Sequence, residues 1–256
     1  MRYRFQASPH RAKRLDDPWS RLAKARKIAE LVDAARPLRG SRVLDVGAGS
    51  GIIASSLAEV VGSAGTVWAL DLVETKPENK RVQVLRGSAT ELPIRDDAFD
   101  VVVSNHVLEH VGPRDNQLRH LLELRRVLKP DGIAYLAVPN RWSIVEPHFG
   151  LPFLSWLPPS LRSSFVRLTA SGSHYDANPP SFKELVRLFE RAGLRYRDRT
   201  MEAIRIMARV ETTGTLRSFL LAVPDWTVKT LHSLIPTFVV ILMRGTGERR
   251  GGERSG

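Results

Sequence analysis

Residues 43–51 read VLDVGAGSG, and the fold expected for this chain follows from them. It opens as a short apolar run with β-branched residues, which is typical of a buried strand in a parallel sheet. Gly47, Gly49 and Gly51 then lead into an apolar-periodic segment, residues 52–61, which predicts a helix. Glycines let a ligand approach the main chain closely, and the first turn of a helix offers free N–H groups. The stretch therefore predicts a ligand site at a strand-to-helix turn.

Four further motifs follow in order. A second apolar strand ends in Asp71, about 20 residues beyond the glycines, where a carboxylate can accept both hydroxyls of a ribose. Two later stretches read GSATELP at 87–93 and FDVVVSNHVLEHV at 99–111, and LKPDG follows at 128–132. A glycine-rich turn followed by an acid also occurs in other doubly wound proteins that bind nucleotides. Membership in such a class would not account for the residues at 105–110.

Together these motifs resemble the class I S-adenosylmethionine-dependent methyltransferases, over about residues 41–140. The resemblance implies that the chain is an enzyme with S-adenosylmethionine as its cofactor. The family often has an acid where this chain has Ser88, whose hydroxyl is a weaker acceptor. The residues expected to hold the cofactor are Asp45, Gly47, Ala48, Gly49, Gly51, Asp71, Leu72, Ser88, Ala89 and Asn105.

Alternating strand and helix patterns predict an α/β fold, a doubly wound and mostly parallel seven-stranded sheet of the Rossmann-like methyltransferase type with helical lid insertions. Between Asp71 and Val82 there is little room for a helix. Helices are expected at 17–35, 51–61, 114–128 and 181–192. Strands are expected at 42–46, 66–70, 82–86, 99–104, 133–138, 194–200 and 237–243, the last of them central in the sheet.

The domain expected at residues 37–244 follows a basic arm and a helix, residues 1–36, and precedes a disordered tail at 245–256. Two insertions, 141–180 and 214–236, leave the fifth and sixth strands at the end where ligands bind in such sheets. Both are therefore expected to form a lid. Their many aromatic residues suggest a substrate with a large apolar part, or else a lid that packs on itself.

The best candidates for a catalytic base are His110 and His106, just beyond the fourth strand, because an unperturbed imidazole titrates near neutrality. Glu109 is expected to orient one of them or to bind substrate. The alternatives are a structural hydrogen bond for His110 and a backbone contact to the cofactor for His106. No group of residues has the spacing typical of metal ligands, so no metal is expected. The expected substrate contacts are His148, Phe149, His174 and Tyr175.

A net charge of +12 favours an anionic partner, and the absence of cysteine fits a reducing compartment. The predicted function is O-methylation of a small or lipid- or glycan-linked substrate by a cytoplasmic enzyme. The basic arm and the second insertion suggest peripheral contact with an anionic membrane at its inner surface. Carbon methylation of the quinone-biosynthesis type remains an alternative. An RNA methyltransferase or a nucleic-acid-binding module is disfavoured, because no aromatic-basic RNA motif is present.

Overall fold

A single mixed sheet of seven strands, in the order β3-β2-β1-β4-β5-β7-β6, forms the centre of the protein. The computed structural model describes residues 18–169, 171–172, 174–210, 212 and 214–245. Within these residues the sheet is parallel except for β7, which runs antiparallel between β5 and β6. The strands are β1 (Arg42–Val46), β2 (Thr66–Asp71), β3 (Val82–Arg86), β4 (Phe99–Asn105), β5 (Leu128–Pro139), β6 (Leu194–Asp198) and β7 (Thr237–Arg244).

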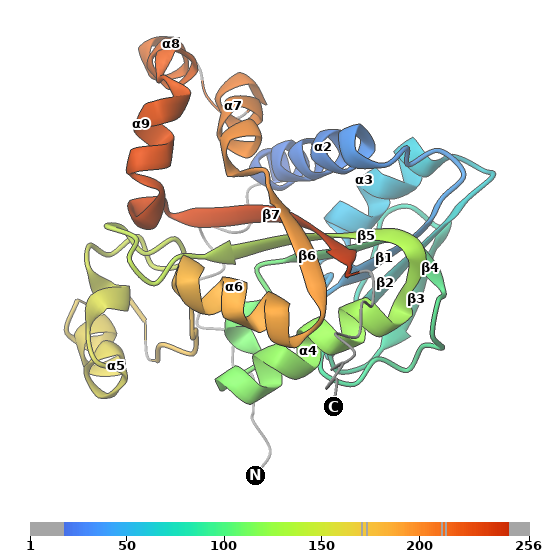
Figure 1. Ribbon diagram of the computed structural model, residues 1–256, viewed down its shortest axis with the longest axis horizontal. Helices are drawn as coiled ribbons and strands as arrows, with labels where there is room; N and C mark the ends of the chain where they lie inside the picture. Colours follow the sequence, from blue (N-terminus) through green and yellow to red (C-terminus); the bar gives the residue numbers. More distant parts are fainter. Residues whose placement is uncertain (1–17, 170, 173, 211, 213, 246–256) are drawn as a thin grey trace, which may run out of the picture.

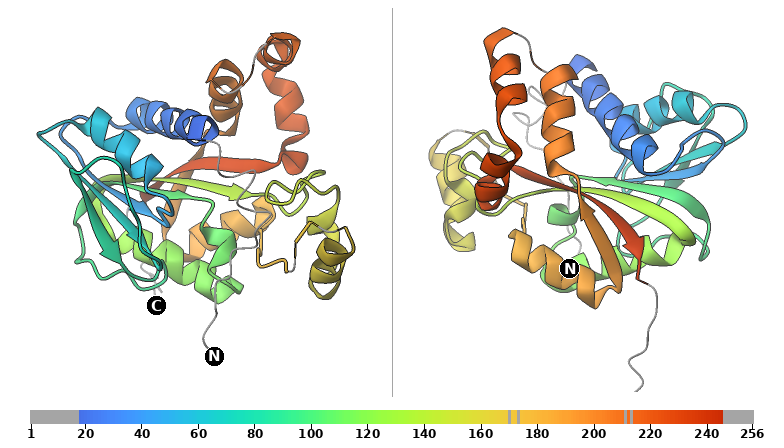
Figure 2. Two further views of the ribbon diagram at one scale, coloured as in Figure 1. Left: turned by 180° about the vertical axis from the view of Figure 1, so that it is seen from behind. Right: turned by 45° about the horizontal axis from the view of Figure 1, so that its top comes forward.

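Helices cover both faces of the sheet (Figures 1 and 2). One face carries α2, α3 and α7, and the opposite face carries α4 and α6. The described helices are α2 (Pro18–Ala35), α3 (Ile52–Val61), α4 (Arg114–Val127), α5 (Pro159–Leu168), α6 (Phe182–Arg191), α7 (Thr200–Val210), α8 (Gly214–Ala222) and α9 (Asp225–Thr230), with short 3-10 turns η1 (Leu108–His110), η2 (Leu154–Trp156) and η3 (His232–Leu234).

Strand β4 shows why the sheet needs two helical layers. Successive side chains of a strand point to opposite faces. Val101 and Val103 accordingly pack in one core with Ile28 of α2, while Val102 packs in the other with Leu121 of α4. All five side chains are fully buried. A strand buried on both faces reads as a continuous apolar run, which is the pattern that identified it in the sequence.

The predicted strands and the doubly wound fold are confirmed, with two local differences. Strand β5 begins at Leu128 rather than near residue 133, because Leu128 pairs with Phe99 before a register shift. Strand β6 ends at Asp198, where its Oδ1 atom accepts the N–H of Thr200 at 2.8 Å. That hydrogen bond begins α7, a helix that the sequence analysis did not predict.

The connection between β2 and β3 contains no helix, as predicted. Within the described residues 72–81 there is neither helix nor strand. This connection packs against the start of α3, because a Cβ atom at Gly51 would lie only 2.9 Å from the Cα atom of Pro77. Gly51 also has a φ of 78°, in the left-handed region that favours glycine. Both the close packing and the backbone conformation therefore favour glycine at this position.

The first insertion, residues 141–180, builds a small core of its own. Leu154, Val166, Tyr175 and Ala177 are buried together, and the partly buried ring of Phe149 packs against them. Many of the aromatic residues of this insertion pack on each other, which was the alternative. That the remaining aromatic residues of this insertion face a substrate stays a prediction.

The second insertion, residues 214–236, follows α7 and returns to the sheet beside the start of the first. The side chain of Asn140 donates to the carbonyl oxygens of Ser233 and Ile235, at 2.7 and 2.9 Å. Beyond α7 it contributes α8 and α9, which stand away from the sheet in Figure 1. Its role as a lid stays a prediction. The basic arm at 1–16 lies outside the described residues, as does the tail at 246–256.

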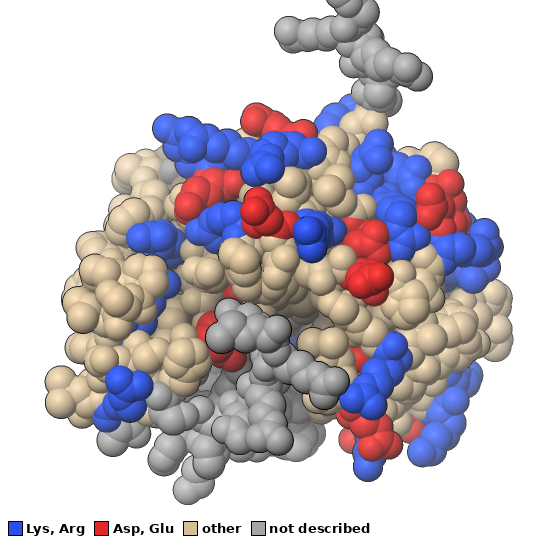
Figure 3. All heavy atoms as spheres, turned by 90° about the horizontal axis from the view of Figure 1, so that it is seen from below, with Lys and Arg blue, Asp and Glu red and all other residues tan. Residues whose placement is uncertain are grey.

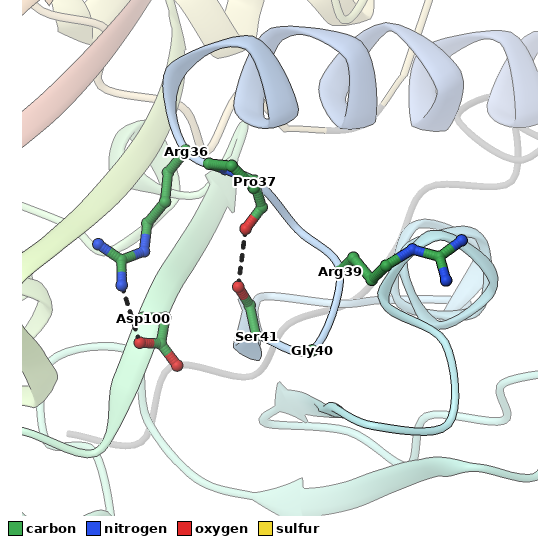
Figure 4. Close-up of a pocket in the computed structure, with 6 residues that line it drawn as sticks. All are labelled: Arg36, Pro37, Arg39, Gly40, Ser41 and Asp100. Atoms are coloured by element: carbon green, nitrogen blue, oxygen red, sulfur yellow. Dashed lines mark hydrogen bonds and ion pairs between the residues drawn. The ribbon is translucent and has the colours of Figure 1, made fainter.

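At the amino ends of β1 and β4, a charged cluster surrounds Asp100. Arg36 and Lys129 contact its Oδ1 atom at 3.1 and 2.8 Å. A cavity of about 370 Å³ lies here, lined by parts of the segment 36–41 and by Asp100. Figure 4 shows Arg36 directed toward Asp100 and Arg39 pointing away from it. Because the glycine-rich loop lies at the other end of these strands, we interpret this cluster as an anchor of the sheet.

Candidate active site

The glycine-rich loop leaves the carboxyl end of β1 and is tied to β2. The N–H groups of Gly47 and Ala48 both donate to the carbonyl oxygen of Leu70, at 2.7 and 3.1 Å. A Cβ atom at Gly47 would lie 2.4 Å from a methyl group of Val107, in the turn after β4. At Gly49, where φ is 53°, a Cβ atom would meet nothing within 4 Å. The loop is therefore packed tightly on one side and open beside Gly49.

Asp71 ends β2 and holds the loop in place. Its Oδ2 atom accepts the N–H of Gly49 at 2.8 Å, and its Oδ1 atom accepts the N–H of Val73 at 3.1 Å. Each carboxylate oxygen keeps a second lone pair for another donor, such as a ribose hydroxyl. The next residue, Leu72, leaves 57% of its surface exposed beside this carboxylate. Both residues lie where the sequence analysis expects the cofactor.

Asp45 is buried beneath the loop, near the end of β1. Its Oδ2 atom is inaccessible and has no hydrogen-bond partner among the described residues. Burial and the nearby charge of Asp71 raise the pKa of Asp45 to about 8. A buried carboxyl with an unused oxygen favours a cationic partner.

The loop after β3 is held by a histidine that the sequence analysis missed. His120 of α4 is fully buried, and its Nδ1–H donates to the carbonyl oxygen of Ala89 at 2.8 Å. Its Nε2 atom then accepts from the hydroxyl of Ser104, at 2.9 Å. Burial lowers the pKa of His120 to about 4, so the ring is neutral. The hydroxyl of Ser88, an expected cofactor contact, forms a hydrogen bond with the hydroxyl of Thr90, with 2.9 Å between the two oxygens.

Three imidazoles surround one buried carboxylate in the turn after β4. His106 has a φ of 58°, unusual for a residue other than glycine, and η1 follows. Glu109 is fully buried, and its Oε1 atom lies 3.2 Å from Nδ1 of His106 and 3.8 Å from Nε2 of His110. The third imidazole is His148 of the first insertion, whose Nε2 atom lies 3.3 Å from the same oxygen. We call these four residues the His–Glu cluster.

Charge is unevenly distributed within the His–Glu cluster. Burial alone would raise the pKa of Glu109, but hydrogen bonds from His106 and His148 hold it well below its usual range. Burial would lower the pKa of His148, but Glu109 and Glu146 together raise it to about 9. Glu146 is itself buried, and its Oε1 atom lies 2.8 Å from Nδ1 of His148. In the absence of any bound cation, a protonated His148 therefore lies between two carboxylates.

The first insertion reaches the cluster by backbone contacts as well. The N–H of Asn178 donates to the carbonyl oxygen of Glu109 at 2.7 Å. Arg114 at the start of α4 donates to the carbonyl of Asn178 at 3.0 Å. Asp176 places its Oδ1 atom 3.8 Å from Nδ1 of His110. These contacts fix the insertion over the carboxyl end of β4, where a lid is expected.

The other expected site residues do not all lie near the His–Glu cluster. Asn105 ends β4 and pairs with Ala137 in the sheet, next to His106. Phe149 and Tyr175 pack against each other with ring centroids 5.7 Å apart. His174 is exposed, and its ring contacts Ser163 of α5 at 3.0 Å. The structure therefore brings His148 into the site and leaves His174 outside it.

Comparison with known proteins identifies the family. Residues 44–136 match a family described as a methyltransferase domain. A demethylmenaquinone methyltransferase of Bacillus velezensis is 30% identical over 171 residues, which cover 60% of this chain and 71% of that protein. The chain belongs to the class I S-adenosylmethionine-dependent methyltransferases. The corresponding enzyme of Bacillus subtilis is 30% identical over 174 residues, covering 61% of this methyltransferase and 72% of its own length.

Solved structures share the fold. A 1,6-didemethyltoxoflavin-N1-methyltransferase of Burkholderia thailandensis, with bound S-adenosylhomocysteine, gives a TM-score of 0.53 at 18% identity and covers 94% of this chain and 92% of that one. A structure described as a sarcosine dimethylglycine methyltransferase of Galdieria sulphuraria gives a TM-score of 0.54 at 16% identity. The match covers 88% of this chain and 86% of that one. These structures confirm the predicted fold, while the family match and the relatives confirm the predicted enzyme class and cofactor.

The residues of this methyltransferase fit S-adenosylmethionine. The unpaired oxygen of buried Asp45 suits the cationic ammonium group of the cofactor, and the carboxylate of Asp71 suits its ribose. The open side of Gly49 leaves space for the cofactor beside the backbone. When bound, the cofactor supplies an activated methyl group on a sulfonium ion. The protein's part is then to orient the acceptor, to manage its proton and to exclude water.

Replacing Asp71 by alanine should weaken cofactor binding about tenfold or more, because two ribose hydroxyls lose an acceptor worth about 1–3 kcal/mol. The loop also loses the partner of the Gly49 N–H. Calorimetric titration with S-adenosylmethionine measures the change. As a control, Asp131→Ala removes an exposed carboxylate paired with Arg36 at the other end of the sheet and should leave affinity unchanged. Equal affinity in wild type and Asp71→Ala would remove Asp71 from the site.

Asp45→Asn should make the cofactor-free protein more stable near neutral pH while weakening cofactor binding. With its pKa raised to about 8, Asp45 holds a proton in the folded state at pH values where the unfolded chain releases it. The free energy of unfolding therefore falls as pH rises from about 4 to about 8, an effect that asparagine does not show. Thermal unfolding across this window should show a gap that widens with pH. A constant gap would contradict the assignment.

Proposed function

We propose that this methyltransferase transfers the methyl group to a hydroxyl oxygen of a small or lipid- or glycan-linked substrate. The His–Glu cluster carries the proposal. It lies directly after β4, and Val107, between His106 and Glu109, contacts the glycine-rich loop. An oxygen nucleophile generally needs a base, and a group of partly buried imidazoles around a buried carboxylate provides one.

Within the cluster, His110 is the best candidate for the base. Its side chain is 11% exposed, so the ring is largely shielded from solvent but can still be reached by a substrate. Nε2 faces His148 at 3.3 Å, and Nδ1 lies 3.8 Å from Asp176. A neighbouring carboxylate stabilises the imidazolium that forms when the ring takes up the proton of a hydroxyl. Glu109 and Glu146 orient the other rings and act as positioning residues.

Apolar surface near the two insertions supports a substrate with an apolar part. Phe153 and Trp156 of the first insertion are 50% and 40% exposed, and their rings lie 5.1 Å apart. A cavity of about 820 Å³ lies between α6, the start of the first insertion and the end of the second. Trp142, Phe182 and Arg187 are among the residues that line it. Aromatic and basic side chains together suit a chain with an anionic head group.

A second candidate function, carbon methylation of a quinone-type ring, is favoured by the relatives named demethylmenaquinone methyltransferase. A carbon nucleophile in an activated ring has less need of the cluster's bases. The two candidates therefore differ in which atom carries the new methyl group.

Methyl-¹³C-labelled S-adenosylmethionine distinguishes the two candidates. The enzyme is incubated in separate reactions with small phenols, polyprenyl-linked sugars, demethylmenaquinol, tRNA and DNA, and the chemical shift of the labelled methyl group is read by NMR. We expect a shift typical of a methyl ether. Label on a ring carbon would instead establish the second candidate, and label recovered in tRNA or DNA would contradict both.

The surface favours a membrane partner over nucleic acid. On the face seen in Figure 3, Lys and Arg are interspersed with Asp and Glu, so that face presents no continuous basic surface for nucleic acid. In the second insertion, Trp226 is 69% exposed. No described helix is long and apolar enough to cross a bilayer. Peripheral binding to an anionic membrane through the arm and this insertion remains our proposal.

A further inference from the structure

Three potential metal ligands converge inside the His–Glu cluster. Nδ1 of His106, Oε1 of Glu109 and Nε2 of His148 all lie within 4.8 Å of one another. The carboxylate oxygen is 3.2 Å from the first nitrogen and 3.3 Å from the second. Three corners of a tetrahedron around an ion with bonds of about 2.1 Å lie about 3.4 Å apart. The donors are therefore near the spacing that such an ion requires.

The surroundings of His148 match a second feature of metal sites. A metal-bound histidine usually donates its other ring N–H to a carboxylate, which fixes the ring and the tautomer. Here the Nδ1 atom of His148 contacts Oε1 of buried Glu146 at 2.8 Å. With the proton on Nδ1, the lone pair of Nε2 points into the cluster. Two further bonds from the N–H groups of His148 and Phe149 to Oε2 hold the Glu146 carboxylate itself.

Glu109 uses its two oxygens very unequally. Oε1 lies within 3.2–3.8 Å of nitrogen atoms from three imidazoles. Oε2 is buried and has no hydrogen-bond partner among the described residues. An unused buried carboxylate oxygen costs about 1–3 kcal/mol. A cation among the donors would engage this carboxylate more fully than shared protons do.

We propose that His106, Glu109 and His148 bind a divalent transition-metal ion such as Zn²⁺, with Glu146 as the positioning carboxylate. Two imidazoles and one carboxylate suit zinc and its neighbours better than magnesium, which prefers oxygen ligands. The ring of His106 is 31% exposed, so the site keeps a side open to a further ligand. No spacing in the sequence indicates this site, because the third ligand comes from the insertion.

This metal site would assist the proposed O-methylation, and in this respect it rests on the proposed function. The open position of the ion would bind the hydroxyl oxygen of the substrate. An ion acting as a Lewis acid lowers the pKa of a bound hydroxyl. The proton passes to His110, and the substrate oxygen forms its bond to the methyl carbon as the carbon–sulfur bond breaks. The sulfonium leaves as a neutral thioether, so charge and atoms balance.

Metal binding is tested directly with the tag-free full chain, stripped with a chelator and titrated calorimetrically with Zn²⁺, Co²⁺ and, for comparison, Mg²⁺. We expect one tight Zn²⁺ site per chain, a Co²⁺ absorption spectrum typical of low coordination number, and much weaker Mg²⁺ binding. His106→Gln and His148→Gln should each weaken Zn²⁺ binding about 100-fold or more. Glu146→Gln should weaken it about 10–100-fold.

The matched control is His174→Gln, which removes an exposed histidine of the same insertion that contacts Ser163. It should bind Zn²⁺ as the wild type does. Thermal unfolding of each variant establishes that it is folded, and Co²⁺ spectra of folded His106→Gln report on the site even where His148→Gln fails to fold. Absence of tight binding, or equal loss in His174→Gln and His106→Gln, would overturn the proposal.

The two proposals fail in different ways. If Zn²⁺ binds at the cluster but the labelled methyl group is found on carbon, the metal site stands and O-methylation does not. If an ether product forms at an unchanged rate after chelation, and no Zn²⁺ binds, O-methylation stands and the metal site does not.

Discussion

Gly49→Val should abolish S-adenosylmethionine binding, with an affinity loss of about 100-fold or more. Gly49 has a φ of 53°, where a β-branched side chain is strained, and its N–H is held by Asp71 at 2.8 Å. The new side chain would also fill the open space beside the loop, where the family places its cofactor. Isothermal titration with the cofactor measures the loss.

A matched control separates lost binding from backbone strain. Gly62 follows α3 at the amino edge of the sheet, has a φ of 74°, and its added Cβ would also meet nothing within 4 Å. Gly62→Val should therefore lower the melting temperature comparably and leave cofactor affinity intact. If Gly49→Val still binds the cofactor within about threefold of wild type, the loop is not the site.

His110→Ala should slow turnover by about 100-fold or more while leaving cofactor affinity nearly unchanged. The ring lies in the turn after β4, with Nε2 3.3 Å from His148 and Nδ1 3.8 Å from Asp176. The contacts described for its ring are with Glu109, His148 and Asp176 rather than with the glycine-rich loop, so we expect cofactor binding not to depend on it. Single-turnover kinetics and calorimetry on the same preparation measure the two quantities.

A structural role for His110 predicts a different result. Turnover and thermal stability would then fall together, and His110→Gln, which retains hydrogen-bonding groups, would restore both. A catalytic base cannot be replaced by an amide, so we expect His110→Gln to be stable and slow. Recovery of turnover in that variant would contradict the base role.

Much of the cofactor site could be predicted because its residues belong to short, continuous motifs. The glycines, Asp45 and Asp71 each lie at the carboxyl end of a strand, and strands of this parallel sheet end at one edge. Leu70, in β2, then joins the loop by accepting from Gly47 and Ala48. His120 was missed because a single histidine in a helix carries no signal of its burial.

The sheet, the glycine-rich loop and the position of His106, Glu109 and His110 in the turn after β4 could all be predicted from local patterns. Hydrophobic periodicity and glycine placement act over a few residues, so they can be read without the fold. The contact of His148 with this turn, from 38 residues beyond His110, is visible only in the folded protein. That contact depends on how the first insertion folds on its own small core and docks through Asn178, which no local pattern encodes.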